Sequence, residues 1–183
     1  MSNSIEFIGY YGGDETHALS AWTSTYRELT EQKIERIPAL LQMLNNDSHG
    51  TPFEKSMLHF LVTSDVASHI HILKHRIGVS VNAESARYKE LKEDKFLIPE
   101  DWNGNKVLEK WAYILKEASI YNNSMYHDCL KDLTPILGRK RAKESARFFK
   151  TYNSQIVQDV SFNWRSFAHF QILRNSEHSQ KEI

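Results

Sequence analysis

The sequence contains a single cysteine, Cys129, among its 183 residues. One cysteine cannot form a disulfide within the chain, and no CxxC pair is present that would hold zinc, so no metal site is expected. The N-terminal residues lack the basic start and apolar run of a secretory signal. No stretch approaches the ~20 apolar residues that span a bilayer. These absences predict a cytoplasmic protein with no membrane contact.

The chain also lacks a net charge, since Lys+Arg and Asp+Glu are equal at 23 each. No global field therefore favours nucleic acid, and an anionic ligand would need a local basic pocket. Internal repeats, low-complexity tracts and long Gly/Ser/Pro linkers are missing too. With 40% hydrophobic and 25% charged residues, we expect one globular domain over residues 1–183.

The hydrophobic periodicity predicts several helices and a few strands. No Gly-rich turn joins a strand to a helix, which favours an α+β fold over a doubly wound one. Strands are expected at Ile5–Ile8, Met57–Thr63 and Ile156–Phe162. Helices are expected from Pro38 to Asn46, from Ser64 or Asp65 to Arg76, from Leu108 to Cys129, from Pro135 to Lys150, and after Asn163, whereas residues 78–85 are expected to form a loop.

The densest polar stretch runs from Lys74 to Tyr88. Lys74, His75 and Arg76 stand at the end of a predicted helix and are followed by Glu84, Ser85 and Arg87. Arginine and lysine in such a stretch bind phosphate, arginine through paired hydrogen bonds. The simpler interpretation is that the three basic groups are favourable charges at a helix C-terminus.

Two further stretches carry polar groups beside aromatic ones. Arg165 and His169, in Asn163–Arg174, are four residues apart and so share a helix face. Aromatic side chains beside them would either pack in the core or stack on a planar ring. His49–Glu54 places a histidine and a glutamate beside glycine and proline before a strand. An amphipathic helix and a surface turn are the plain alternatives.

These three stretches, in this order, resemble the sequence blocks of the ThyX-type flavin-dependent thymidylate synthases. The family's Arg-His-Arg, spacer, Ser and Arg-Tyr pattern is similar to residues 74–88, and its His-x-Thr-Pro-Phe-Glu block to residues 49–54. Its Asn-x-Arg-Ser block is similar to residues 163–174, and the tail matches through Gln180 and Glu182-Ile183. Ala21–Ser24 resembles a weaker N-terminal block. The resemblance spans nearly the whole chain.

The resemblance implies a mainly antiparallel sheet flanked by helices, assembled as a homotetramer. Each active site would lie at subunit contacts, with FAD bound across more than one chain. His49 and Glu54 resemble other positions around the site. By position, the residues implied to line the flavin site are Thr51, Lys74, His75, Arg76, Glu84, Asn163, Trp164, Arg165 and His169.

For the substrate dUMP, the resemblance implies a site that accepts a phosphate and a uracil ring. Ser85 and Arg87 suit the phosphate, because a hydroxyl and a bidentate cation bind phosphate oxygens. Arg174 would be catalytic, polarising the uracil and stabilising the negative charge that develops on it. The implied substrate-binding residues are His71, Lys74, Glu84, Ser85, Arg87, Arg147 and Arg174.

The implied reaction is the reductive methylation of dUMP to dTMP. Methylenetetrahydrofolate would supply the carbon and NADPH would reduce the flavin, so the cofactor would carry the hard chemistry. This family needs no cysteine nucleophile, and Cys129 lies among apolar residues of a predicted helix. Cys129 is therefore expected to be a core thiol.

The chain departs from the family pattern at several positions. Lys74 replaces the first arginine, the spacer before Ser85 holds eight residues rather than seven, and His71 stands where many members have glutamine. After Arg147 the expected Leu-Pro is replaced near Lys150 by Lys-Thr. Relatives usually continue beyond Ile183, so a compact or truncated member is expected.

Three other functions remain open at this point. The first is an enzyme that delivers a hydroxymethyl group to dUMP instead of a methyl group. The second is an inactive family member that is kept for assembly. A nucleic-acid-binding module would use the basic run Arg139-Lys140-Arg141 and Lys143, although Glu144 balances that run on a predicted helix.

Overall fold

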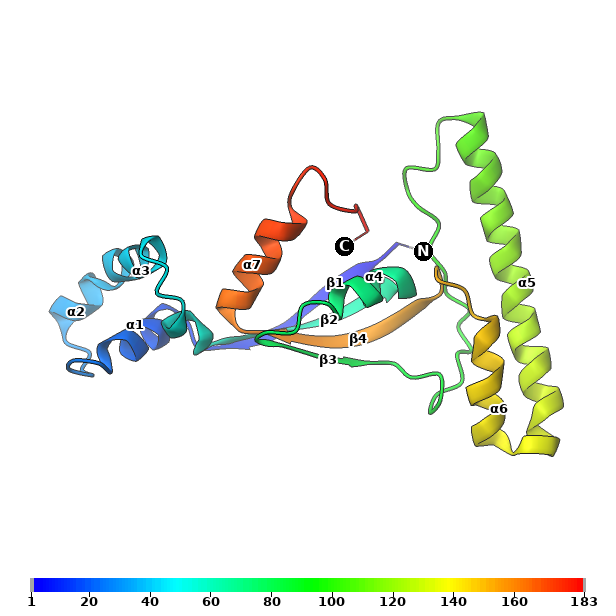
Figure 1. Cartoon of the computed structure of the whole chain (residues 1–183), viewed down its shortest axis with the longest axis horizontal. Coiled ribbons are helices and arrows are strands. Elements are labelled where there is room, and N and C mark those ends of the chain that lie inside the picture. The colour runs from blue at the N-terminus through cyan, green and yellow to red at the C-terminus, as the bar shows by residue number, and fades with distance from the viewer. Residues whose placement is uncertain (1, 183) are drawn as a thin grey trace.

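The computed structural model describes residues 2–182 as an antiparallel sheet with helices on one face and at both ends (Figure 1). The four strands lie in the order β1-β2-β4-β3, and every neighbouring pair is antiparallel. The expected α+β class with a mainly antiparallel sheet is confirmed. The strands are β1 (Ser4–Tyr11), β2 (Met57–Asp65), β3 (Val79–Ala83) and β4 (Gln155–Phe162).

Two helices cover one face of the sheet, namely α4 (Val66–Ile72) and α7 (Trp164–Arg174). The contact of α7 with the sheet is aromatic: the Phe60 and Phe167 rings stack with centroids 5.6 Å apart, and Phe162 lies 5.4 Å from Phe170. Alternate strand residues point to the same face, which places these phenylalanines together. This layer is what sets the position of α7 on the sheet.

Both covering helices begin at the residues that the sequence predicted as caps. The Asp65 side chain accepts a hydrogen bond from the Ser68 amide at 2.9 Å, and Asn163 accepts one from the Ser166 amide at 2.8 Å. Such a bond satisfies one of the free N–H groups of the first turn. However, α4 ends at Ile72 rather than near Arg76, so residues 74–76 lie in the turn that follows the helix.

Residues 78–85 were predicted to form a loop, and this prediction is wrong. Val79–Ala83 forms β3, an edge strand that pairs with β4, with Val79 opposite Phe162 and Ala83 opposite Gln158. Apolar and polar residues alternate along β3 in the sequence, and half-buried and exposed side chains alternate in the same way in the structure. This alternation covers only five residues and stands among polar residues, so it was not recognised as a strand. Pairing with the edge of β4, rather than local propensity, decides the conformation of this segment.

The ends of the molecule hold the remaining helices. At one end lie α1 (Asp14–Trp22), α2 (Glu31–Glu35), α3 (Ile37–Asn46) and the short 3₁₀ helix η1 (Thr51–Glu54). Pro38 stands in the first turn of α3, as predicted, where its missing N–H costs no hydrogen bond.

At the other end, α5 (Lys106–Leu137) and α6 (Arg139–Ala146) form a hairpin, followed by the 3₁₀ helix η2 (Arg147–Phe149). The predicted start of the second helix at Pro135 is wrong, because Pro135 lies in the last turn of α5 and Gly138, at φ 76°, makes the break. Cys129 is partly buried there, as expected of a core thiol. It packs against the hairpin core, which consists of Tyr126, Leu130, Ala142 and Ala146.

None of the helices within residues 2–182 combines the length and the apolar character that crossing a bilayer requires.

Candidate active site

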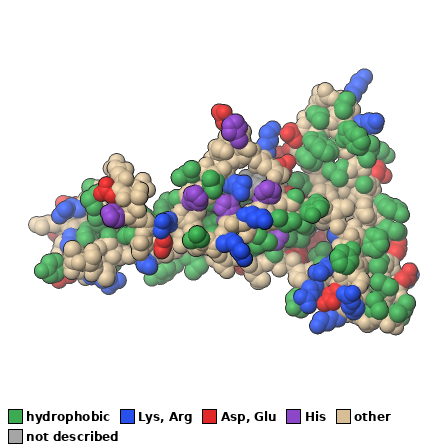
Figure 2. Space-filling view, viewed as in Figure 1, with side chains coloured by type: hydrophobic (Ala, Val, Ile, Leu, Met, Phe, Trp, Pro, Cys, Tyr) green, Lys and Arg blue, Asp and Glu red, His purple; other side chains and the backbone are tan. Residues whose placement is uncertain are grey.

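A hollow of about 780 Å³ lies where the turn after α4 meets the first turns of α7. Its wall is unusually basic: Figure 2 shows lysine, arginine and histidine side chains gathered over this central part of the molecule. Two stretches about 90 residues apart in the sequence therefore share one surface. The lining residues are Lys74, His75, Arg76, Ile77, Val79, Arg165, Ser166 and His169.

Gly78 allows the two stretches to meet. The Asn163 amide donates to the Gly78 carbonyl at 2.9 Å, and Ser166 Oγ donates to the Ile77 carbonyl at 2.6 Å. Gly78 has φ +64°, and a Cβ there would lie 2.2 Å from Asn163 Nδ2. Both the left-handed backbone and the lack of space require glycine at this junction.

The third sequence stretch reaches the same region through Arg165. Arg165 Nη1 donates to Glu54 Oε1 at 2.6 Å, and the Arg165 side chain lies across Gly50, where a Cβ would be 2.5 Å from Arg165 Nε. Thr51 begins η1 directly after Gly50 and is exposed. All three stretches that the sequence singled out thus converge around the N-terminus of α7.

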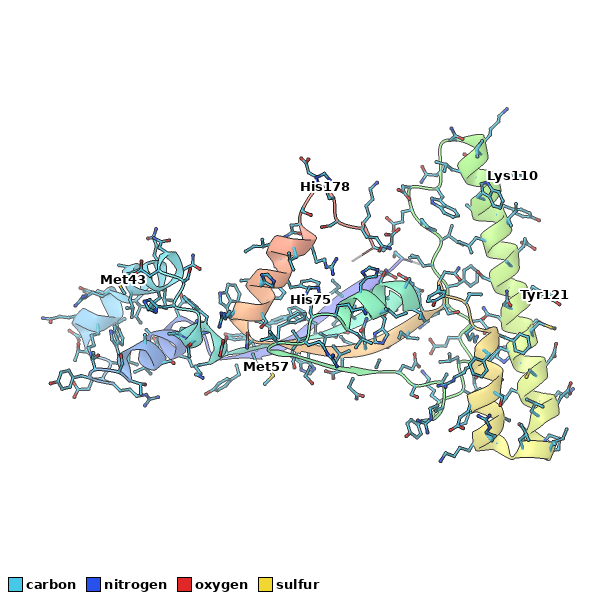
Figure 3. All side chains as sticks on the ribbon, in the orientation of Figure 1. Met43, Met57, His75, Lys110, Tyr121 and His178 are labelled. Atoms are coloured by element: carbon cyan, nitrogen blue, oxygen red, sulfur yellow. The ribbon has the colours of Figure 1, made fainter. Side chains whose placement is uncertain are left out.

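Arg174, at the C-terminal end of α7, belongs to this region as well. Arg174 Nη2 donates to His75 Nε2 at 3.0 Å, and the His75 ring lies 4.9 Å from Phe170. In Figure 3 the labelled His75 lies between α7 and the sheet. Arg174 Nε is buried and has no hydrogen-bond partner within residues 2–182. A buried donor without a partner is costly, which marks it as a contact for a bound ligand.

The same neighbours control the charge of His75. Burial lowers the pKa of His75 below its ordinary value, and the positive charge of Arg174 and the proximity of His169 lower it further. A neutral His75 accepts the hydrogen bond from Arg174 on Nε2 and carries its own proton on Nδ1. The cationic charge at this point therefore belongs to Arg174.

A second group of predicted residues lies beyond the other end of β3. The Arg87 Nε donates to Glu144 Oε1 at 3.2 Å, and Ser85 Oγ accepts from the Arg87 amide at 3.3 Å. Arg147 is exposed at the start of η2. β3 contributes five residues, or roughly 16 Å of extended chain, between this group and the basic hollow.

The structure accordingly divides the residues predicted to bind dUMP between two places. Lys74 lines the hollow and Arg174 is hydrogen-bonded to His75, which also lines it, whereas Ser85, Arg87 and Arg147 lie past the far end of β3. One chain alone does not bring these two groups together.

The other predicted residues are placed as follows. Glu84 lies in the far group, where it pairs with Lys89 and accepts from the Val157 amide at 3.3 Å. His71 is exposed on α4. The Asn163 side chain is occupied as the cap of α7, and Trp164, 43% exposed, borders Phe167.

Sequence reasoning did not identify the partners that hold these groups. Glu144 holds Arg87, and Lys143 Nζ donates to the Tyr88 carbonyl at 2.7 Å. Glu144 also accepts from Arg141 at 3.4 Å, and Arg139 pairs with Glu90 at 2.8 Å. Because acidic residues pair these arginines on α6, the basic run 139–141 is a poor surface for nucleic acid. Partners this distant in sequence leave no local signal.

Comparison with known proteins agrees with this arrangement. Residues 6–183 match the family model Thy1, described as thymidylate synthase complementing protein. A flavin-dependent thymidylate synthase of Streptomyces avermitilis is 25% identical, covering 97% of this chain and 77% of the relative. One from Thermosipho melanesiensis is 32% identical, covering 93% of this chain and 76% of the relative.

A solved structure shares the fold. The crystal structure of the UMP/dUMP methylase PolB from Streptomyces cacaoi, bound with 5-Br dUMP, superposes with a TM-score of 0.84 at 24% identity, covering all of this chain and 85% of that one. The family match extends over all three stretches that converge on α7. The chain belongs to the Thy1 family of thymidylate synthase complementing proteins, as the resemblance of its sequence blocks predicted.

Proposed function

We propose that this protein is a flavin-dependent thymidylate synthase that methylates dUMP to dTMP, with methylenetetrahydrofolate as the carbon donor. The observation that carries the proposal is the basic hollow beside α7, where three family blocks meet around Arg165 and an unpaired Arg174 Nε. The family membership and the relatives' activity support it.

The residues present at the hollow fit FAD. Its volume of about 780 Å³ is in the range of cofactor sites, and its basic side chains match a pyrophosphate. Lys74, Arg76 and Arg165 would hold the phosphates, with His75 and His169 beside the ring system. When bound, the flavin would supply the reducing equivalents, and NADPH would be the reductant.

The chain's own side chains would bind and polarise the nucleotide. Ser85, Arg87 and Arg147 supply a hydroxyl and two cations for the phosphate. Arg174, held by His75 in a partly buried setting, would place a fixed positive charge where negative charge develops on the uracil ring. His71 and Glu84 complete the proposed nucleotide site.

Assembly follows from the separation of the two groups of residues. The nucleotide site would combine Arg174 of one chain with Ser85, Arg87 and Arg147 of another, and FAD would cross the contact between them. We propose that the chains form a homotetramer and that the protein is cytosolic. Large exposed apolar side chains support such contacts: Ile5, Tyr10, Phe148 and Tyr152 are each at least 70% exposed. Such patches mark protein–protein contacts.

The visible absorption spectrum of the purified protein tests the cofactor. We expect flavin absorbance at a near-stoichiometric FAD ratio, either directly or after adding FAD. With FAD, NADPH and methylenetetrahydrofolate, mass analysis should find dUMP converted to dTMP. A colourless protein whose added FAD shows no fluorescence quenching would refute the proposal, and a hydroxymethyl product would replace it with the hydroxymethylating alternative.

A further inference from the structure

Segment 84–94 carries the proposed phosphate-binding residues and runs along the α5–α6 hairpin. Several contacts fasten it there: Arg87 to Glu144, Lys143 to the Tyr88 carbonyl, and Arg139 to Glu90. Arg87 and Arg139 are 47% and 67% exposed, and exposed ion pairs contribute little to holding a segment. They do not by themselves explain how the segment keeps one position.

The contact at the end of the segment differs in burial. Lys150 Nζ donates to Asp94 Oδ1 at 2.8 Å and to Asn123 Oδ1 at 2.7 Å, and it lies 4.4 Å from the centre of the Tyr126 ring. The Lys150 side chain is only 9% exposed. The Lys150 ammonium therefore donates its hydrogen bonds to protein groups, in a site largely shielded from water.

Other side chains converge on the same carboxylate. His127 Nε2 lies 3.0 and 2.9 Å from the two Asp94 oxygens, and Asn123 Nδ2 donates to the Asp94 carbonyl at 3.2 Å. Partial burial acts to raise the pKa of Asp94, but hydrogen bonds from Lys150 and His127 bring it below the ordinary value, so the carboxylate is charged at neutral pH. Asp94 has φ 50°, a left-handed backbone that these contacts hold in place.

This cluster joins both halves of the proposed phosphate site. Asp94 ends segment 84–94, and the Tyr126 hydroxyl, under Lys150, accepts from the Leu91 amide at 3.1 Å. Lys150 directly follows η2, whose first residue is Arg147, and its amide donates to the Arg147 carbonyl at 3.1 Å.

We propose that Lys150 is a positioning residue for the nucleotide site, and that by closing on Asp94 it fixes segment 84–94 relative to Arg147. The inference rests on the proposed function, since it assigns the phosphate of dUMP to that site. Lys150 touches no substrate in this role. Its contacts restrict the motion of segment 84–94 and of the chain at Arg147. Without them, both would become ordered only when dUMP binds, and the entropy lost at that point would weaken the affinity for dUMP.

Isothermal titration of FAD-loaded protein with dUMP tests this role. Lys150→Met keeps the length and apolar stem of the side chain but removes its charge, and we expect it to raise the Kd for dUMP about tenfold, or about 1.4 kcal/mol. The KM for dUMP should rise by a similar factor, while the kcat and the Kd for FAD change less than about twofold, since Lys150 contacts none of the residues that line the hollow. Lys150→Arg should recover part of the affinity because it retains the charge.

Two further variants guard against a general effect on folding. Asp94→Asn removes the carboxylate charge at a backbone conformation that asparagine tolerates, and it should also weaken dUMP binding. The matched control is Lys95→Met. Lys95 directly follows Asp94 and forms an ion pair with Glu93, which is exposed. This variant should bind dUMP like the parent.

The outcomes are distinct. Unchanged dUMP affinity in both Lys150→Met and Asp94→Asn would overturn the positioning role, as would an equal loss of FAD and dUMP binding. A parent protein that binds FAD but no dUMP at all would instead overturn the proposed function.

Discussion

At the scale of single residues, the geometry of Arg174 changes what its removal should do. The resemblance aimed this arginine at the uracil ring and assigned the flavin to other residues. In the structure Arg174 donates to His75, a proposed flavin residue, through Nη2 and keeps Nε unpaired. Arg174 therefore stands between the two proposed ligands rather than on one side of them.

Arg174→Ala should lower turnover of dUMP by roughly 30-fold or more, since losing a desolvated charged contact costs ~2–5 kcal/mol. It should also raise the pKa of His75, because one of the positive charges that lower it is gone. Tritium release from C5-labelled dUMP measures the first effect, and NMR titration of the imidazole measures the second. Arg174→Lys, as the control, should restore the low pKa more fully than the turnover. Near-parental turnover in a flavin-loaded Arg174→Ala protein would show that the nucleotide site is misassigned.

At the scale of elements, the decisive feature is the junction between β3 and α7. It sets Lys74, His75 and Arg76 against Arg165 and His169, and its geometry depends on one glycine. Gly78, with φ +64°, is the residue at which the chain turns into β3.

Gly78→Ala should destabilise the protein and weaken FAD binding together. The added Cβ would lie 2.2 Å from Asn163 Nδ2 and 2.4 Å from Ser166 Oγ, in a backbone conformation that alanine rarely adopts. Such strain costs ~1–3 kcal/mol before the collision is counted. Denaturant unfolding and FAD fluorescence quenching measure the two effects.

Gly104→Ala is the matched control for this prediction. Gly104 has φ +69°, but no atom lies within 4 Å of the place that a Cβ would take, so this variant carries the backbone strain without the collision. FAD affinity that falls equally in both variants would contradict a specific role for the Gly78 junction.

At the scale of the whole molecule, the distance between the two groups of nucleotide residues is the main feature. Arg87 and Arg147 lie beside the α5–α6 hairpin, past the far end of β3 from Arg174, and α7 packs on the sheet through aromatic contacts. The proposed site, which is composed of both groups, would therefore need a second chain.

Mixing two inactive variants tests this composition. Arg87→Ala and Arg174→Ala should each have little activity alone, but mixed oligomers formed from equal amounts should regain about a quarter of the parental activity, because a quarter of the shared sites receive both intact arginines. Activity is measured after joint refolding, with the separately refolded variants as controls. No recovery in demonstrably mixed oligomers would place both arginines in one chain's site.

The sequence by itself determined the fold class, the cap at Asn163, a cap at either Ser64 or Asp65, and the three blocks that form the candidate site. These features depend on nearby residues: the caps on hydrogen bonds within one turn, and the blocks on side chains that a short stretch carries.

Only the tertiary structure decided which residues face one another. β3 was predicted to be a loop because its five residues form a strand through pairing with β4, about 80 positions away in the chain. The split between Arg174 and Ser85, the pairing of Arg174 with His75, and the burial of Lys150 against Asp94 likewise join distant segments. Such contacts have no local pattern, since a side chain's charge and depth are set by the segment that folds against it.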